Sequence, residues 1–142
     1  MDPHLRANYI LTLVAAAGLS AVAFLIYTAE PPDALTLTGL LIMILAGILL
    51  ITARIQLGSS FAVTAQARRL VTTGLYARFR HPIYLFAQAV LFGIALSLRR
   101  PAYFAAWLIL LAIQISRARR EDKVLEEKFG DEFREYRKKT WF

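Results

Sequence analysis

The chain has 142 residues, enough for a single domain. It is 58% hydrophobic with a mean hydropathy of +0.50, which is high for a soluble protein. It has no cysteine and only two histidines, His4 and His81, which excludes disulfides and thiolate catalysis and leaves no basis for a metal site. The net charge of +7 comes from cations beside long apolar blocks, which favours contact with membrane headgroups over nucleic acid.

The amino-terminal part of the chain predicts a hairpin of two transmembrane helices. Between Arg6 and Glu30 lie 23 uncharged residues, enough for one helix across about 30 Å of hydrocarbon. A short acidic connection, Glu30 to Asp33, leads into 20 more uncharged residues at 34–53. The first stretch is longer than the apolar part of a secretory signal and a second span follows directly, so we interpret it as a retained anchor.

The next segment, residues 54–80, predicts a cytoplasmic loop. Gly58-Ser59-Ser60 and Thr72-Thr73-Gly74 mark it as irregular. It holds no acidic residue and five arginines, namely Arg54, Arg68, Arg69, Arg78 and Arg80. Cytoplasmic loops of membrane proteins carry such an excess of cations, and the segment is therefore expected inside.

Two shorter apolar stretches follow, at 83–98 and 102–116, joined by Arg99-Arg100-Pro101. Each would form about 24 Å of helix, which is short for a full span. They predict a short hairpin that barely crosses the bilayer. Arg99 and Arg100 would lie outside, against the charge rule, but the cationic loop and tail outweigh them. The expected topology has four transmembrane helices with both termini in the cytoplasm.

The segment 117–139 is densely charged, with nine cations and seven anions. Its apolar residues recur every three or four positions and predict one stripe of an amphipathic helix, made of Val124, Leu125, Phe129, Phe133 and Tyr136. Gly130 is a candidate break or cap. The fold class is therefore all-α integral membrane: four transmembrane helices, the last two a short hairpin, plus a cytoplasmic amphipathic helix that packs against the loop. The chain forms one domain, with residues 1–56 as its amino-terminal hairpin and 57–142 as its core.

The most informative stretch for chemistry is 70–84. Gly74 permits a turn, while Pro82 suits a helix start and biases His81 toward extended backbone. Hydrogen-bonding side chains gather here at the membrane boundary, namely Tyr76, Arg78, Arg80, His81 and Tyr84. By chemistry alone, this set fits an interfacial anchor as well as it fits a site.

Two carboxylates, Glu121 and Asp122, follow the fourth apolar stretch. Their spacing alone favours a solvated face of a charged helix, with Glu121 paired to Arg117. The alternative is a pair of carboxylates near the bilayer surface that receives a cationic ligand.

Taken in order, four elements resemble a known family: residues 70–76, the run Arg80-His81-Pro82-Ile83-Tyr84, the pair Glu121-Asp122 and the segment 129–136. They are similar to isoprenylcysteine carboxyl methyltransferases, and the related phospholipid N-methyltransferases share much of the pattern. The resemblance covers about residues 58–136. It implies that S-adenosylmethionine binds in a pocket formed by the last two transmembrane helices and the carboxy-terminal segment, which makes 57–142 a cofactor-binding core.

Carried over by position, the resemblance implies a cofactor site lined by Gly74, Tyr76, His81, Pro82, Tyr84, Glu121 and Asp122. Carboxylates and hydrogen-bonding rings suit the ammonium, ribose and sulfonium of that cofactor. Arg80 or Arg78 would hold an ionised acceptor, and Glu121 or His81 would deprotonate an amine. The chain departs from the family pattern at Asp122, where a second Glu is usual, and at Phe133, where Tyr is more frequent.

The leading hypothesis is methyl transfer from S-adenosylmethionine to a lipophilic acceptor, with the cofactor site on the cytoplasmic side. Prenylcysteine carboxyl O-methylation is the nearest resemblance. The alternatives are N-methylation of a phospholipid ethanolamine headgroup and a catalytically silent scaffold with the same fold. A transporter is disfavoured because the expected spans carry no charged residue of the kind that marks an ion pathway. The expected partners are the lipophilic substrate and membrane lipids.

Overall fold

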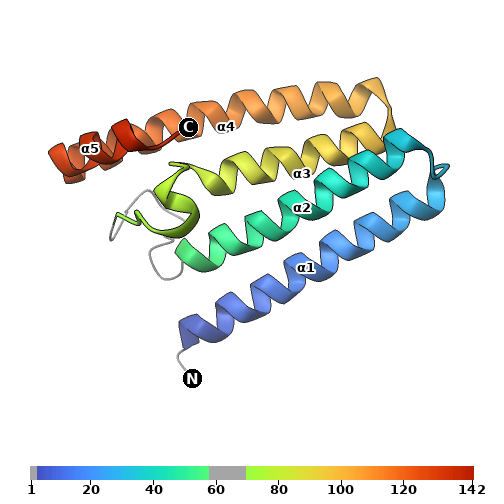
Figure 1. Ribbon diagram of the computed structural model, residues 1–142, viewed down its shortest axis with the longest axis horizontal. Coiled ribbons are helices and arrows are strands. Elements are labelled where there is room, and N and C mark those ends of the chain that lie inside the picture. Colours follow the sequence, from blue (N-terminus) through green and yellow to red (C-terminus); the bar gives the residue numbers. More distant parts are fainter. Residues whose placement is uncertain (1–2, 58–69) are drawn as a thin grey trace.

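The described part of the chain folds into four long helices that run alternately up and down, followed by a short α-helix (Figure 1). The computed structural model describes residues 3–57 and 70–142. Its elements are α1 (Pro3–Ala29), α2 (Ala34–Leu57), the 3-10 helix η2 (Gly74–Ala77), α3 (Pro82–Leu98), α4 (Pro101–Phe129) and α5 (Asp131–Lys139). Because successive long helices reverse direction, both ends of the chain lie at the same end of the bundle (Figure 1).

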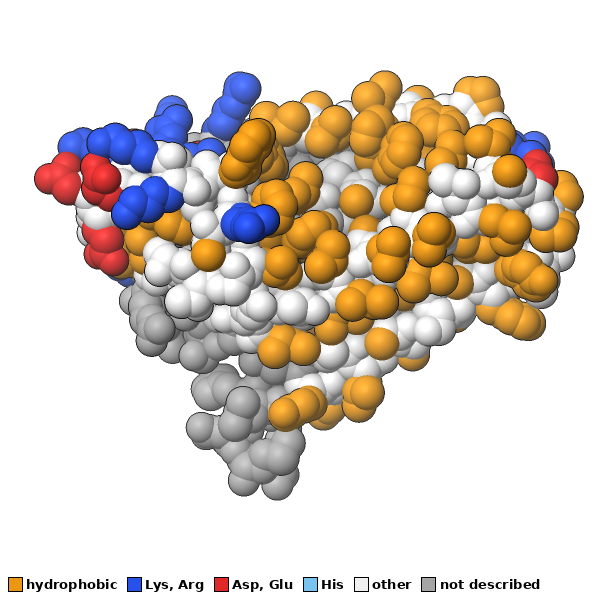
Figure 2. Space-filling view, viewed as in Figure 1, with side chains coloured by type: hydrophobic (Ala, Val, Ile, Leu, Met, Phe, Trp, Pro, Cys, Tyr) orange, Lys and Arg blue, Asp and Glu red, His pale blue; other side chains and the backbone are white. Residues whose placement is uncertain are grey.

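Three of these helices are long and apolar enough to cross a membrane, over Tyr9–Ala29, Ala34–Leu57 and Pro101–Phe129. The fourth, α3, is apolar but has only 17 residues. Apolar side chains cover the length of the bundle, while charged side chains gather at the end that holds α5, with a few at the opposite end (Figure 2). The predicted all-helical membrane character is confirmed.

The fourth apolar stretch, 102–116, lies within a longer helix that also contains charged residues. α4 runs for 29 residues, because no glycine or proline interrupts the sequence between Pro101 and Gly130. Gly130 has a positive φ of 51°, which glycine adopts without strain, and it separates α4 from α5. α2 also extends past the expected boundary at Arg54 to Leu57. The expected loop signal at 58–60, together with Arg68 and Arg69, lies outside the described residues.

α2 and α3 make the closest helix–helix contact of the bundle, because Gly39 and Gly93 face each other where the helices cross. A Cβ added to Gly39 would lie 2.5 Å from the backbone oxygen of Gly93, and one added to Gly93 would lie 2.6 Å from the backbone oxygen of Gly39. The hydroxyl of Ser97 donates to the carbonyls of Thr36 at 3.2 Å and Gly93 at 3.0 Å. Small residues let membrane helices approach backbone to backbone, and this crossing fixes the orientation of α3.

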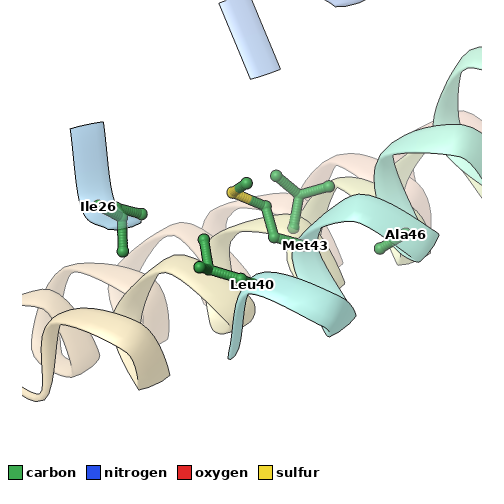
Figure 3. Close-up of a cluster of buried hydrophobic side chains, with 5 residues drawn as sticks. Ile26, Leu40, Met43 and Ala46 are labelled. Atoms are coloured by element: carbon green, nitrogen blue, oxygen red, sulfur yellow. The ribbon is translucent and has the colours of Figure 1, made fainter. Parts of the chain in front are cut away.

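An apolar core joins α1 to this pair. It consists of the buried residues Ile26, Leu40, Met43, Ala46 and Val90. Figure 3 shows Ile26 on α1 across from Leu40 and Met43 on α2. Only 6% of the α1 span is buried, and α1 lies on the side of the bundle away from α4 (Figure 1). α1 is thus peripheral. The candidate functional site lies on α3 and α4, and α2 supports these helices.

The end of the bundle opposite both termini is closed by ion pairs. Asp33 caps α2 by accepting the backbone N–H of Thr36 at 2.9 Å, and this bond is the main cause that lowers the pKa of its carboxyl. Arg99 pairs with Asp33 and, at 3.6 Å, with Glu30. Arg99, which appears in the sequence as an external cation against the charge rule, is thus matched by two acids from the preceding connection.

Candidate active site

The candidate site lies where the start of α3 meets α4. Pro82 opens α3 at its first turn and is fully buried, and His81 immediately before it is 6% exposed. The His81 ring lies between two carboxylates of α4: its Nε2 is 2.8 Å from Asp122 Oδ1, and its Nδ1 is 3.7 Å from Glu121 Oε2. Because an ionised carboxylate only accepts hydrogen bonds, the N–H of His81 Nε2 is the donor in this contact with Asp122. The structure thus brings together groups that are 40 residues apart in the sequence.

Arg80 joins the same cluster through the Asp122 oxygen that His81 also contacts. Its Nε lies 3.4 Å from Asp122 Oδ1, and its side chain is only 13% exposed. Nε and Nη1 are both buried, and neither makes a hydrogen bond to any residue in 3–57 or 70–142. A buried polar group without a partner costs about 1–3 kcal/mol, which makes these atoms candidate donors for a ligand. Arg78, the other cation considered for this role, is exposed.

Two tyrosines, Tyr76 and Tyr84, lie beside this cluster and form one wall of the candidate site with His81 and Arg80. Tyr84 stacks on His81, with ring centroids 5.6 Å apart and an interplanar angle of 24°. Tyr76 is 6% exposed, and its hydroxyl is buried without a hydrogen-bond partner. Burial raises the pKa of Tyr76 well above its usual range, so the hydroxyl stays protonated and can donate. Among the residues that the structure describes, no hydrogen bond reaches the Tyr76 hydroxyl or Arg80 Nη1.

Gly74 shapes this wall by its backbone conformation. It begins η2 with a positive φ of 62°, and a Cβ added to it would lie 2.5 Å from Gln56 Oε1. The same Gln56 oxygen accepts the backbone N–H of Leu75 at 2.7 Å. Gly74 thus seats η2 against the end of α2, which holds Tyr76 in place.

The last residues of the chain close the site, a feature that the sequence reading missed. Phe79 and Trp141 form an isolated parallel bridge, and the backbone N–H groups of Arg80 and His81 donate to the backbone oxygen of Phe142 at 2.9 and 3.1 Å. The Phe142 ring meets the His81 ring edge-on at 5.9 Å. No local sequence pattern predicts a backbone pairing between segments that are about 60 residues apart. The two aromatic residues at 141 and 142 were the only available signal.

α5 holds the turn from outside. Of the predicted apolar stripe, Phe133 is fully buried and Tyr136 is 8% exposed. The hydroxyl of Tyr136 donates to the backbone carbonyl of Tyr76 at 2.7 Å. These positions also explain both departures from the family pattern. A buried Phe133 needs no partner for a hydroxyl, and Asp122 reaches His81 with its shorter side chain.

Replacing Tyr136 with Phe should lower the free energy of unfolding by about 0.5–1.5 kcal/mol, the net value of one hydrogen bond. Burial raises the pKa of Tyr136 from 10.0 to about 12. The stabilisation is therefore present below pH 10 and is lost as the pH rises toward 12, and Tyr136→Phe should lack that step. Thermal unfolding in detergent across this pH range measures both effects. The exposed Tyr103 supplies the control, and an equal effect of Tyr103→Phe would contradict the assignment.

Comparison with known proteins supplies a reaction class for this geometry. Residues 34–132 match a family model described as phospholipid methyltransferase. The match covers well over half of the chain, from the start of α2 to the start of α5, and includes every candidate residue from Gly74 to Asp122. This family shares much of its motif pattern with the isoprenylcysteine carboxyl methyltransferases. A comparison with curated proteins finds no match.

Proposed function

Because the chain belongs to the phospholipid methyltransferase family, we propose that it transfers a methyl group from S-adenosylmethionine to a lipophilic acceptor at the membrane. The family supplies the reaction type. The observation that carries the proposal is the cluster of Arg80, His81, Glu121 and Asp122 where α3 meets α4, because it places paired charges and unsatisfied donors at the edge of the apolar bundle.

The residues of the cluster fit the chemistry of this cofactor. Glu121 is 43% exposed beside His81, so its carboxylate is available to the cofactor's ammonium or ribose hydroxyls. The unpartnered donors of Arg80 and Tyr76 suit the cofactor's carboxylate and other acceptor atoms. An aromatic face such as that of Tyr84 attracts a sulfonium by about 0.5–2 kcal/mol. Together with Pro82, which begins α3, and Gly74, which seats η2, these residues form the proposed cofactor site.

The roles of the side chains follow from the acceptor. The bound cofactor supplies a methyl group on a good, neutral leaving group, so the main task of the protein is positioning. A carboxylate acceptor is already ionised at neutral pH, and Arg80, whose Nη1 is buried without a partner among the described residues, would hold it. An amine acceptor must lose a proton, and Glu121 is the exposed base that would take it. We assign the catalytic roles to Arg80 and Glu121 on these grounds.

The first candidate acceptor is a prenylcysteine carboxylate. The guanidinium of Arg80 in the cluster supports it, because arginine is well suited to binding a carboxylate. The second candidate is the ethanolamine headgroup of a phospholipid. The description of the matched family favours it, and so does the exposed carboxylate of Glu121.

The proposed topology places four helices across the membrane. α3, with 17 residues, would reach about 26 Å, close to the lower limit for a span. Both ends of the chain and the cluster lie at one end of the bundle, where most of the charged side chains gather (Figures 1 and 2). We place this end in the cytoplasm, where a soluble cofactor is available and cationic segments are favoured.

Calorimetric titration of the purified full chain in detergent tests the enzyme assignment. S-adenosylmethionine and its demethylated product should both bind at one site per chain. Membranes incubated with methyl-labelled cofactor and either an N-acetylated prenylcysteine or phosphatidylethanolamine should then label one of these acceptors. Absence of cofactor binding would overturn the proposal and support a silent scaffold.

A further inference from the structure

The hairpin formed by α4 and α5 separates its charges along its length. The part near the apolar bundle, residues 117–123 and 136–139, holds seven cations and only two acids, which are Glu121 and Asp122 of the candidate site. The part around the turn at Gly130, residues 124–135, holds two cations and five acids. All seven cations of the first part are exposed, and we call them the basic belt: Arg117, Arg119, Arg120, Lys123, Arg137, Lys138 and Lys139. On the face that Figure 2 shows, cationic side chains accordingly lie between the apolar length of the bundle and the acidic side chains at its tip.

The fold brings the end of α5 back to the membrane boundary. Arg134 and Arg137 pair with Glu126 of α4 at 2.8 and 3.9 Å, so α5 folds back alongside the end of α4 (Figure 1). The last segment, residues 140–142, which we call the strap, then pairs with the backbone at Phe79. Phe79 lies three residues before Pro82, where α3 begins. The strap and the end of the basic belt therefore lie at the level where the apolar helices start.

Trp141 in the strap is exposed at this boundary. It is 80% exposed, more than any other large apolar residue in the described part of the chain, while its backbone N–H donates to the carbonyl of Arg78 at 2.8 Å. The backbone is thus fixed and the indole is left uncovered by the protein. Tryptophan is enriched at membrane–water boundaries, because its ring is apolar and its N–H is polar. An uncovered indole beside a row of cations at this level fits the headgroup region of a bilayer.

We propose that the basic belt and Trp141 bind the headgroups of anionic phospholipids, and that this contact holds the strap over the candidate site. Charge complementarity selects the partner, because a belt of seven exposed cations is attracted to a negatively charged lipid surface. The strap transmits the contact, since the backbone N–H groups of Arg80 and His81 donate to the backbone oxygen of Phe142, the residue after Trp141. The effect on the cofactor site rests on the proposed function, whereas the contact with lipid does not.

A belt that only orients the chain in the membrane predicts a different outcome. Cytoplasmic cations set the topology of membrane proteins as they insert. That role is complete once the protein is inserted, so the charge of the lipid would no longer affect the site. A second copy of the chain that covered Trp141 would likewise keep the indole out of reach of lipid. Both alternatives are separated from the proposal by measurements on the inserted protein.

Quenching by brominated phospholipids locates the indole. Trp107→Phe leaves Trp141 as the only tryptophan of the chain. In vesicles of phosphatidylcholine and phosphatidylglycerol in equal shares, bromines near the headgroup end of the acyl chains should quench its fluorescence more than bromines near the methyl end. If Trp107→Phe does not fold, the difference between the wild type and Trp141→Phe gives the same signal. Absence of quenching, or stronger quenching from the methyl end, would overturn the inference.

Calorimetric titration of the full chain with S-adenosylmethionine in lipid nanodiscs measures the effect on the site. Replacing half of the phosphatidylcholine with phosphatidylglycerol should lower the Kd of the wild type about fivefold, the factor for one cation held at an anionic surface. Lys139→Gln, which removes the cation directly before the strap, should reduce this response. Arg100→Gln, at an exposed arginine at the opposite end of the bundle, is the matched control and should retain it. High salt should weaken the response of the wild type, because exposed charges are screened.

The outcomes separate this inference from the proposed function. An unchanged Kd in the two lipid compositions, or an equal loss of response in Lys139→Gln and Arg100→Gln, would overturn the link between the basic belt and the site. Either result would leave the proposed function standing. Absence of cofactor binding in both compositions would instead refute the proposed function, while the quenching experiment would still decide whether Trp141 contacts lipid.

Discussion

The His81→Ala variant is expected to lose methyl transfer by about 100-fold or more, the scale on which one preorganised polar group contributes to catalysis. His81 is the buried group that lies between Asp122 and Glu121, and it also stacks on Tyr84. Without the imidazole ring, both carboxylates lose a partner. The rings of Tyr84 and Phe142 also lose the ring that they both contact. Initial rates with methyl-labelled cofactor measure the loss.

Glu121→Gln sharpens this test, because it keeps the shape of the side chain and removes its charge. The variant should lose cofactor affinity and rate together if Glu121 meets the ammonium of the cofactor or accepts a proton. Glu127→Gln is the matched control, since Glu127 is an exposed carboxylate on the same helix. Circular dichroism and gel filtration in detergent verify that each variant is folded. Wild-type activity in both His81→Ala and Glu121→Gln would refute the site assignment.

Gly93→Ala is expected to lower the free energy of unfolding by about 1–3 kcal/mol, the usual cost of overpacking. Its new Cβ would lie 2.6 Å from the backbone oxygen of Gly39 and 2.7 Å from the backbone nitrogen of Met43. Backbone atoms cannot rotate away as a side chain does, so α2 and α3 must separate. Thermal unfolding followed by circular dichroism measures the change.

Gly18→Ala supplies the matched control for this substitution. Gly18 lies within α1, and a Cβ added there meets no atom within 4 Å. The same change of residue should be neutral or stabilising at this position, because alanine favours helix over glycine by up to about 1 kcal/mol. The two variants thus have opposite expected signs. Equal stability of Gly93→Ala and Gly18→Ala would show that the glycine crossing does not control the packing of α2 on α3.

Part of the candidate site could be read directly from the chain. The turn at Gly74, the helix start at Pro82 and the break at Gly130 depend on backbone preferences of single residues, and each lies where those preferences indicate. The end of the fourth helix could not be predicted from charge, because a helix does not end where charged residues begin. α4 continues through them, which carries Glu121 and Asp122 as far as His81.

A hydrogen bond between Gln88 and Gln114 joins α3 to α4, and the sequence carries a signal for it. Gln88 and Gln114 are polar residues in otherwise apolar stretches, and each lies seven positions from a candidate site residue. A spacing of two helical turns places residues on one face of a helix, so the pattern already indicated two aligned polar positions. Which helices face each other, however, is not encoded in that spacing.

The sequence by itself determined the membrane class, the helical hairpin at the amino terminus and the position of the motif residues, because apolar length, charge and turn residues act locally. Only the tertiary structure decided that His81 contacts Asp122, that Phe142 covers Arg80 and His81, and that Arg99 is neutralised by Glu30 and Asp33. These contacts depend on how each helix is rotated and crossed, which is set by close packing such as that at Gly39 and Gly93. The motif becomes a site only when that packing brings α4 against the start of α3.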